Sequence, residues 1–446
     1  MTMSSINHRA IALAIGVLGV GPGVSYAADC NWTVKGRLKV EHRLSELKTA
    51  YGTSALENVE VKVSAKEKVP VIGWGTWNGW PTVRTRSDGS FTVTTTRNCD
   101  QRRFKVEVQF ADDDLEVRHE HATSSLDKVK WYTIIDEASG EHAAGTTDYG
   151  DEIFRASGAH DLNDDEAWSH ADIWFLYKKA IAKAASYGSD YAFTTKVQIK
   201  YPHNSAVAGD EAEASYANPT TKVIYIFRSN DGREDHFSVD TLLHEMGHVW
   251  AYNHTSGEIC LTETLLLHGN THGLVDDHCV AFHEGWAEFY AHEMKRALLG
   301  GTKVLPYSRP ELNDSGGSVS PALTSKSLVQ RHDAGWLSVL HTLTTPALFI
   351  YKFGTPGDTT PKPKIEALPA YGVACPSPNV SFKDVMSVFN AGGQYPNKLS
   401  RSETTIDAFI DRAAARLGSL SVEDAETIKK LVNPASSVQP LDELCR

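Results

Sequence analysis

Residues 238–252 read SVDTLLHEMGHVWAY and contain the pattern His-Glu-x-x-His. On an α-helix, residues four apart share a face, so the imidazoles of His244 and His248 can bind one zinc ion. Glu245 lies one step round the helix, where it can accept a proton from a water that zinc has acidified. The stretch therefore predicts a helix that carries a catalytic zinc site.

The residues around this motif suit a buried metal helix. Thr241, Leu242 and Leu243 precede it, Val249 and Trp250 follow it, and none of them is charged. The alternative is a pair of helix histidines with ordinary hydrogen-bond partners, because a chain with 19 histidines can contain the five-residue pattern by chance.

A catalytic zinc ion takes three protein ligands and keeps a fourth position open. Residues 283–288 read HEGWAE, and Glu284 follows His248 by 36 residues. Together the two motifs resemble the gluzincin metallopeptidases, in which a downstream helix supplies Glu as the third zinc ligand and a second acid supports a ligand histidine. The resemblance implies that Glu284 is the third ligand and Glu288 the acceptor of an imidazole N–H. If the two helices pack so that Glu284 and Glu288 share one face, we expect Trp286 to turn away. The family more often has Asp at the position of Glu288.

A second candidate for the third ligand is His254. The metzincin signature is H-E-x-x-H-x-x-G-x-x-H, and His254 falls at its last position, but Ala251 replaces the glycine. That glycine permits a turn that often has a positive φ, which costs alanine about 1 kcal/mol or more. Metzincins also place a Met-containing turn beneath the metal, whereas Met294, the nearest downstream methionine, lies in a helical pattern. We therefore expect the gluzincin arrangement and keep His254 as the alternative.

Residues 28–120 have the pattern of short β-strands. Apolar and polar residues alternate over 32–40, 59–63, 82–96 and 104–110, with a hairpin signal at Ser87-Asp88-Gly89. This predicts a β-sandwich domain. The runs GRLKV, NVEVKV and TRSDGSFTV resemble the transthyretin-like modules found beside secreted and cell-surface peptidases.

The rest of the chain divides by pattern. Residues 121–165 are polar without a clear period, which indicates a linker or lid. A zincin catalytic subdomain is expected over 166–300 and a helical C-terminal subdomain over 301–446. The predicted fold class is multidomain α+β: an N-terminal β-sandwich, then a zincin-like catalytic region with a helical C-terminal part. The expected helices are 167–187, 238–252, 280–299, 328–342, 382–389, 405–417 and 422–431, and the expected strands of the catalytic region are 196–201 and 222–227.

Composition limits the possible partners. The 446 residues include 44 Lys+Arg and 56 Asp+Glu, a net charge of -12, with 41% hydrophobic residues. These values are typical of globular chains and exclude disorder over most of the length. The acidic balance argues against a nucleic-acid partner or an anionic membrane surface, and no stretch of the mature chain has the pattern of a transmembrane segment. No oligomeric state follows from the sequence.

Residues 1–27 have the pattern of a signal peptide, because a short apolar run at 10–20 is followed by Ser25-Tyr26-Ala27, a cleavage signature. A membrane anchor is the alternative. In an exported chain, an even number of cysteines indicates disulfides. Their clustering predicts one bridge per region, and no spacing suggests a thiolate zinc site. The predicted pairs are Cys30–Cys99, Cys260–Cys279 and Cys375–Cys445.

These expectations combine into an exported zinc metallopeptidase, secreted, periplasmic or at the cell surface, that hydrolyses protein or peptide substrates with Glu245 as general base. The oxyanion partner is expected in the C-terminal part, where His332 and Tyr371 are candidates. One alternative is a surface adhesin or glycan-binding protein with an inactive peptidase core, for which the aromatic loop Trp74, Trp77 and Trp80 is the only support. Another is a zinc hydrolase of a different amide or ester.

Overall fold

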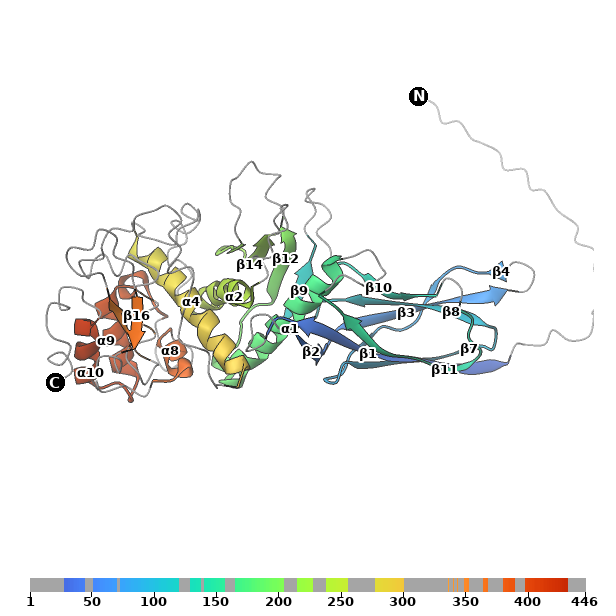
Figure 1. The fold of residues 1–446 in the computed structure, drawn as a ribbon, viewed down its shortest axis with the longest axis horizontal. Coiled ribbons are helices and arrows are strands. Elements are labelled where there is room, and N and C mark those ends of the chain that lie inside the picture. The colour runs from blue at the N-terminus through green and yellow to red at the C-terminus, as the bar shows by residue number, and fades with distance from the viewer. Residues whose placement is uncertain are drawn as a thin grey trace, which may run out of the picture.

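A computed structural model of the chain gives an elongated molecule with three successive parts: a β-rich N-terminal part, a central layer of helices beside a small sheet, and a helical C-terminal part (Figure 1). The signal-peptide prediction falls on residues 1–27, outside the described residues. The described residues are 28–44, 51–69, 73–119, 129–137, 140–156, 165–203, 215–227, 238–255, 277–300, 336, 340, 343, 349–352, 364–367, 380–389 and 398–431.

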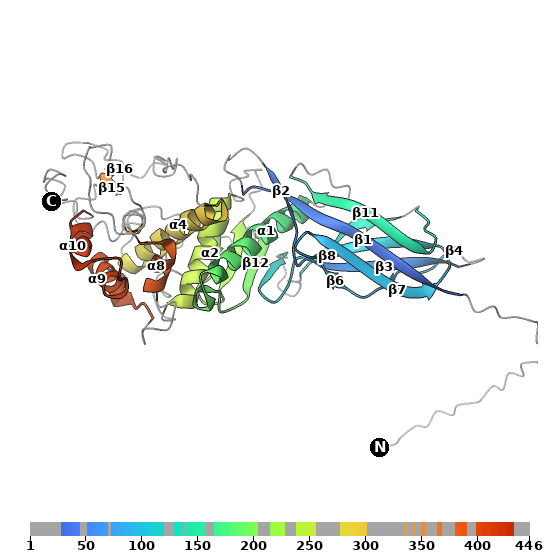
Figure 2. The same cartoon turned by 90° about the horizontal axis from the view of Figure 1, so that it is seen from below.

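Two sheets form the N-terminal sandwich and confirm the predicted fold of this part (Figure 2). Valines at alternate positions of β3, such as Val61 and Val63, face the core opposite Val106 and Val108 of β8. The predicted Cys30–Cys99 disulfide is present and joins the start of β1 to the chain just after β7. One sheet contains β1 (Asp29–His42), β2 (Gly52–Ala55), β7 (Ser90–Asn98) and β11 (Gly145–Phe154). The other contains β3 (Glu60–Val69), β4 (Gly73–Trp74), β5 (Asn78–Gly79), β6 (Val83–Arg84), β8 (Arg102–Gln109) and β10 (Tyr132–Asp136).

The region predicted as a linker or lid, 121–165, instead supplies two strands of the sandwich. β10 pairs antiparallel with β8, and β11 pairs parallel with β1 from Trp32 to Val40. The side chains of β11 are mostly polar and exposed or half-buried, and only Phe154 is fully buried. An outer strand of this kind has almost no apolar period, so the sequence pattern did not reveal it.

A second, four-stranded sheet lies in the central part, with the strand order β13-β14-β12-β9. It contains β12 (Val197–His203), β13 (Tyr216–Ala217) and β14 (Val223–Phe227), of which β12 and β14 confirm predicted strands. Its fourth strand, β9 (Leu115–Arg118), follows directly from the sandwich and pairs parallel with β12. The chain therefore passes directly from the last residues of β8 in the sandwich into a strand of the central sheet.

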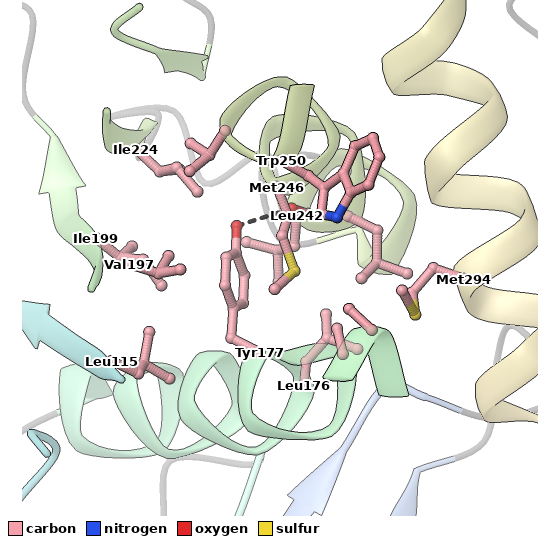
Figure 3. Close-up of a cluster of buried hydrophobic side chains, with 14 of the residues drawn as sticks. Leu115, Leu176, Tyr177, Val197, Ile199, Ile224, Leu242, Met246, Trp250 and Met294 are labelled. Carbon is pink, nitrogen blue, oxygen red and sulfur yellow. Dashed lines mark hydrogen bonds between the residues drawn. The ribbon is translucent and has the colours of Figure 1, made fainter. Parts of the chain in front are cut away.

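The helix α1 (Asp165–Ser186) lies beside the end of the sandwich (Figure 2) and contacts both β1 and β9. Its indoles bond to the sandwich backbone: Trp168 donates to the Glu41 carbonyl over 2.7 Å and Trp174 to the Glu57 carbonyl over 3.1 Å. The 3-10 turn η1 (Ser189–Tyr191) follows it. The other face of α1 enters the central core, where Leu176 and Tyr177 meet residues of the sheet and of the next helix (Figure 3).

Two long helices confirm the prediction for the central part. The helix α2 (Val239–His254) begins at Ser238, whose side chain accepts the Thr241 N–H. The helix α4 (His278–Leu298) begins at Asp277, which caps Cys279 in the same way. Leu242, Met246 and Trp250 form the apolar stripe of α2 (Figure 3), so the sheet and α1 bury one face of this helix.

The C-terminal part packs on α4 through aromatic residues. Phe389 lies 4.2 Å from the ring of Trp286, and Phe282 lies 4.8 Å from that of Trp336. The helices α8 (Phe382–Val388), α9 (Ile406–Arg416) and α10 (Val422–Leu431) confirm three predicted helices, with the 3-10 turn η5 (Arg401–Glu403) before α9. The strands β15 (Phe349–Lys352) and β16 (Lys364–Ala367) form a small antiparallel sheet that the sequence did not predict. Among the described helices, none has the length and apolar character to span a membrane.

Candidate metal centre

The helix α2 places His244 and His248 one turn apart. Their Nε2 atoms lie 3.0 Å apart and the two rings are nearly perpendicular, at 83°. His248 is 1% exposed. Both imidazoles therefore direct a nitrogen toward the same point in a largely buried site.

Glu284 of α4 completes the cluster. Its Oε2 atom lies 3.3 Å from His244 Nε2 and 3.5 Å from His248 Nε2. A tetrahedral ion with bonds of about 2.1 Å separates its ligand atoms by about 3.4 Å. All three observed separations are close to that value, and two imidazole nitrogens with one carboxylate oxygen are a donor set that suits zinc. The group His244, His248 and Glu284 can therefore hold a metal ion.

A close helix crossing brings Glu284 to this point. A Cβ added at Gly247 would lie 3.0 Å from the Ala287 Cα atom and 3.2 Å from the Ala287 carbonyl oxygen. Trp286 Nε1 also donates to the Gly247 carbonyl over 3.1 Å. The expectation that Trp286 turns away is therefore wrong. Its indole bonds to α2, because its large ring fills the apolar space between the two helices and Phe389.

Glu288 lies one turn beyond Glu284 and is buried. Its Oε1 atom is 3.6 Å from His244 Nδ1, the ring nitrogen opposite the one in the cluster. A carboxylate on that side favours the tautomer and orientation of a ligand imidazole. The predicted pairing of Glu288 with a ligand histidine thus has a partner within reach, at slightly more than hydrogen-bonding distance.

Glu245 lies beside the cluster and is 5% exposed. Burial raises the pKa of its carboxyl to about 7, the positive charge of His244 opposes the rise, and the negative charge of Glu284 adds to it. The Ala217 N–H of β13 also bonds to this carboxyl. Among the described residues, no hydrogen-bond partner reaches the Oε2 atom of Glu245. A carboxyl with such a pKa and an available oxygen can act as a general base near neutral pH.

The charges within the cluster affect one another strongly. Burial alone would lower the pKa of His244, but its hydrogen bond to Glu284 and the surrounding carboxylates raise it to about 9. Burial alone would raise the pKa of Glu284, but His248 and His244 hold it well below the usual range. The neighbouring carboxylates thus favour a proton on His244, and a metal ion bound there would displace it.

His254 does not join this cluster. Its Nε2 atom lies 3.1 Å from the Ala192 carbonyl oxygen, and its ring stacks on Trp250 at 4.2 Å. Burial lowers the pKa of His254 to about 4. The side chain therefore has a local partner near the C-terminal end of α2, apart from His244 and His248.

Three residues contribute to the surroundings of the cluster in ways that were not predicted: Gly247, Trp286 as a link between the helices, and Tyr252, whose ring stacks on His248. The spacing of Tyr252 was a usable signal, because it falls four residues after His248 on the same helix face. The oxyanion candidates His332 and Tyr371 lie outside the described residues.

Comparison with known proteins assigns no family to this chain. The sequence matches no protein-family model. No curated protein shows significant similarity to it.

Proposed function

We propose that this chain is an exported zinc metallopeptidase. The single observation that carries the proposal is the convergence of His244 Nε2, His248 Nε2 and Glu284 Oε2, at separations of 3.0, 3.3 and 3.5 Å. This spacing suits a tetrahedral zinc site with one position left for water or substrate. Zinc is preferred over Mg²⁺ or Ca²⁺ because two of the three donors are imidazoles.

The proposed chemistry assigns each residue one task. When bound, zinc would polarise the scissile carbonyl and make a water molecule more acidic. Glu245 would accept the proton of the attacking water and pass it to the leaving amine. Glu288 would hold the His244 ring through Nδ1, so that Nε2 stays available.

The central sheet supports a peptide as the substrate. In the described part of the chain, β13 is one of the two outer strands of this sheet, and its Ala217 N–H reaches Glu245. An extended peptide can add to a sheet edge through main-chain hydrogen bonds. Such a peptide would run past the general base and the proposed metal ion together.

Export is supported by the signal-peptide pattern at residues 1–27 and by the Cys30–Cys99 disulfide, because disulfides persist mainly outside the reducing cytosol. The alternative function as an adhesin gains little from the aromatic loop. Trp80 is buried in the sandwich core, whereas Trp74 and Trp77 are half-buried. The Trp74 ring lies 4.0 Å from the Arg103 guanidinium and the Trp77 ring 4.3 Å from the Lys66 ammonium, so each already has a partner within the sandwich domain.

The test is metal analysis of the purified mature protein, combined with cleavage of a broad peptide library. We expect one zinc per chain, cleavage that stops with a chelator, and recovery when zinc is returned. A protein that binds zinc but cleaves no peptide would support a different zinc hydrolase. A protein without zinc affinity would reject the proposal.

A further inference from the structure

Tyr252 continues the face of α2 that carries the two histidines. His244, His248 and Tyr252 follow one another at intervals of four residues, so each lies one turn above the last. The Tyr252 ring lies 6.1 Å from the His248 ring and nearly parallel to it, at 13°. It also lies 5.5 Å from the ring of His283, the neighbour of Glu284 on α4. Tyr252 thus occupies the space between the two helices beside the cluster.

The hydroxyl of Tyr252 is buried and has no hydrogen-bond partner among the described residues. The side chain is 7% exposed. A buried hydroxyl without a partner is destabilising, because it has lost its hydrogen bonds to water and gained none in the protein. A phenylalanine would fill the same space without this cost, so packing alone does not account for a tyrosine here.

The surroundings of the hydroxyl indicate what it can bond. The Tyr252 ring stacks on His248, whose Nε2 atom lies 3.5 Å from Glu284 Oε2. The charges of Glu284 and Glu245 both act on the Tyr252 hydroxyl. Glu284 directs Oε2 at both histidines, which leaves its other oxygen in need of a donor once a metal is bound.

We propose that the Tyr252 hydroxyl donates a hydrogen bond to Glu284 in the metal-bound protein and so fixes the orientation of this ligand. Tyr252 is then a positioning residue that acts through Glu284. The inference rests on the proposed metal site and adds a residue that the His-Glu-x-x-His pattern does not contain.

Tyr290 provides a matched control. It is fully buried, and its hydroxyl too lacks a partner within the described residues. Burial raises the pKa of Tyr290, and Tyr187 adds to the rise, with no contribution from the cluster carboxylates. Tyr252→Phe and Tyr290→Phe therefore remove the same atom from similar surroundings, but only the first removes it beside Glu284.

The experiment measures Zn²⁺ and Co²⁺ affinity by chelator competition for the full mature chain and both variants, with Co²⁺ absorption as a report on ligand geometry. Loss of an outer-shell partner typically weakens metal binding 10–100-fold. We expect that loss and an altered Co²⁺ spectrum for Tyr252→Phe, and wild-type affinity for Tyr290→Phe. Thermal unfolding of metal-free Tyr252→Phe should show no loss of stability, because the variant removes an unpaired hydroxyl.

Three results would overturn the inference. Wild-type metal affinity in Tyr252→Phe would do so, and if turnover fell at the same time, the hydroxyl would belong to substrate binding. Equal losses of affinity in both variants would show a packing effect. A wild-type chain that binds neither ion would reject the metal site itself. A wild-type chain that binds zinc but cleaves no peptide would reject only the peptidase proposal, since metal affinity still tests Tyr252.

Discussion

The indole nitrogen of Trp286 donates to the carbonyl oxygen of Gly247 over 3.1 Å, and this bond joins the two helices that carry the candidate metal ligands. Gly247 occupies one of the two variable positions of His-Glu-x-x-His, directly before His248. Its missing side chain lets Ala287 approach, and its carbonyl accepts the indole. The position of Glu284 thus depends on contacts made by residues that bind no metal.

Gly247→Ala should weaken both the fold and the cluster. The new methyl group would meet the Ala287 backbone at 3.0 Å, and backbone cannot rotate away as a side chain can. Overpacking typically costs about 1–3 kcal/mol, and a shift of α4 would also move Glu284. Denaturant unfolding and zinc titration measure the two effects. The control is Gly418→Ala, because a methyl group there meets no atom within 4 Å. Unchanged stability and affinity in Gly247→Ala would show that the helices separate at little cost.

Three single variants distinguish the possible third ligands. Glu284→Ala should remove zinc, because it deletes one of three ligand atoms, and Glu288→Ala should weaken binding 10–100-fold. His254→Ala should keep zinc and lose stability instead, since its ring packs on Trp250. Zinc content after dialysis against equal chelator gives the order. A metal-free His254→Ala together with a zinc-loaded Glu284→Ala would restore the metzincin hypothesis.

Glu245→Gln should retain zinc and lose peptidase activity. The change preserves size and removes only the basic carboxylate, and general base catalysis contributes about 10²–10⁴-fold. The rate of cleavage per zinc-loaded chain is the quantity to measure. Near-wild-type turnover would mean that another group activates the water.

Asp172 predicts a pH dependence of stability that is independent of the metal site. Burial raises the pKa of its carboxyl from 3.8 to about 7, and the nearby Arg43 opposes the rise. Between these two values the folded chain holds a proton that the unfolded chain releases, so the free energy of unfolding falls as pH rises toward 7 and then levels off. The upper limit of this loss is about 4 kcal/mol.

Asp172→Asn should therefore stabilise the protein at pH 8 and change little at pH 4. Denaturant unfolding at both pH values measures the difference. The control is Asp151→Asn, because the hydrogen bond with Lys39 lowers the pKa of Asp151 and the sign is reversed. Destabilisation of Asp172→Asn at pH 8 would show that the ionised carboxyl is stabilised by Arg43 more than burial penalises it.

Peptide mapping under non-reducing conditions should link Cys279 to Cys260 and Cys375 to Cys445. Cys279 is disulfide-bonded in the first turn of α4, while the other three cysteines lie outside the described residues. A peptide that joins Cys279 to Cys375 or Cys445 would show that the bridge connects the metal helix to the C-terminal part.

The sequence predicted the helices and strands in which apolar residues recur regularly along the whole element. The helix of His244 and His248 and the helix of Glu284 are both rich in buried apolar residues, and each begins at a capping residue, Ser238 or Asp277. Strands β3 and β8 alternate cleanly because one face packs in the sandwich core. These periods arise from burial on one side, which is the property that a pattern can record.

The missed features depend on contacts between distant segments. Strand β11 is held by pairing with β1 rather than by its own apolar face. The role of Gly247 depends on Ala287, and the bond of Trp286 depends on the carbonyl of a residue on another helix. Backbone hydrogen bonds and close helix crossings leave no periodic signal in either segment. The site could therefore be predicted as a set of ligands, but not as a packed arrangement.

Strand β9 has a consequence for how the molecule is made and degraded. Its four residues, Leu115–Arg118, leave the sandwich and lie against β12, so the central sheet gains an outer strand from the N-terminal part. During synthesis from the N-terminus, β9 is made before its partner β12. Once the sandwich has folded, β9 can offer its backbone hydrogen-bonding groups to β12 and so help the central sheet to form beside α2. Proteolytic removal of the sandwich together with β9 would leave one edge of β12 without a pairing strand. It would also expose to solvent the core residues that Leu115 covers. The N-terminal part therefore contributes a strand directly to the central sheet, and the central part without it would lose one outer strand.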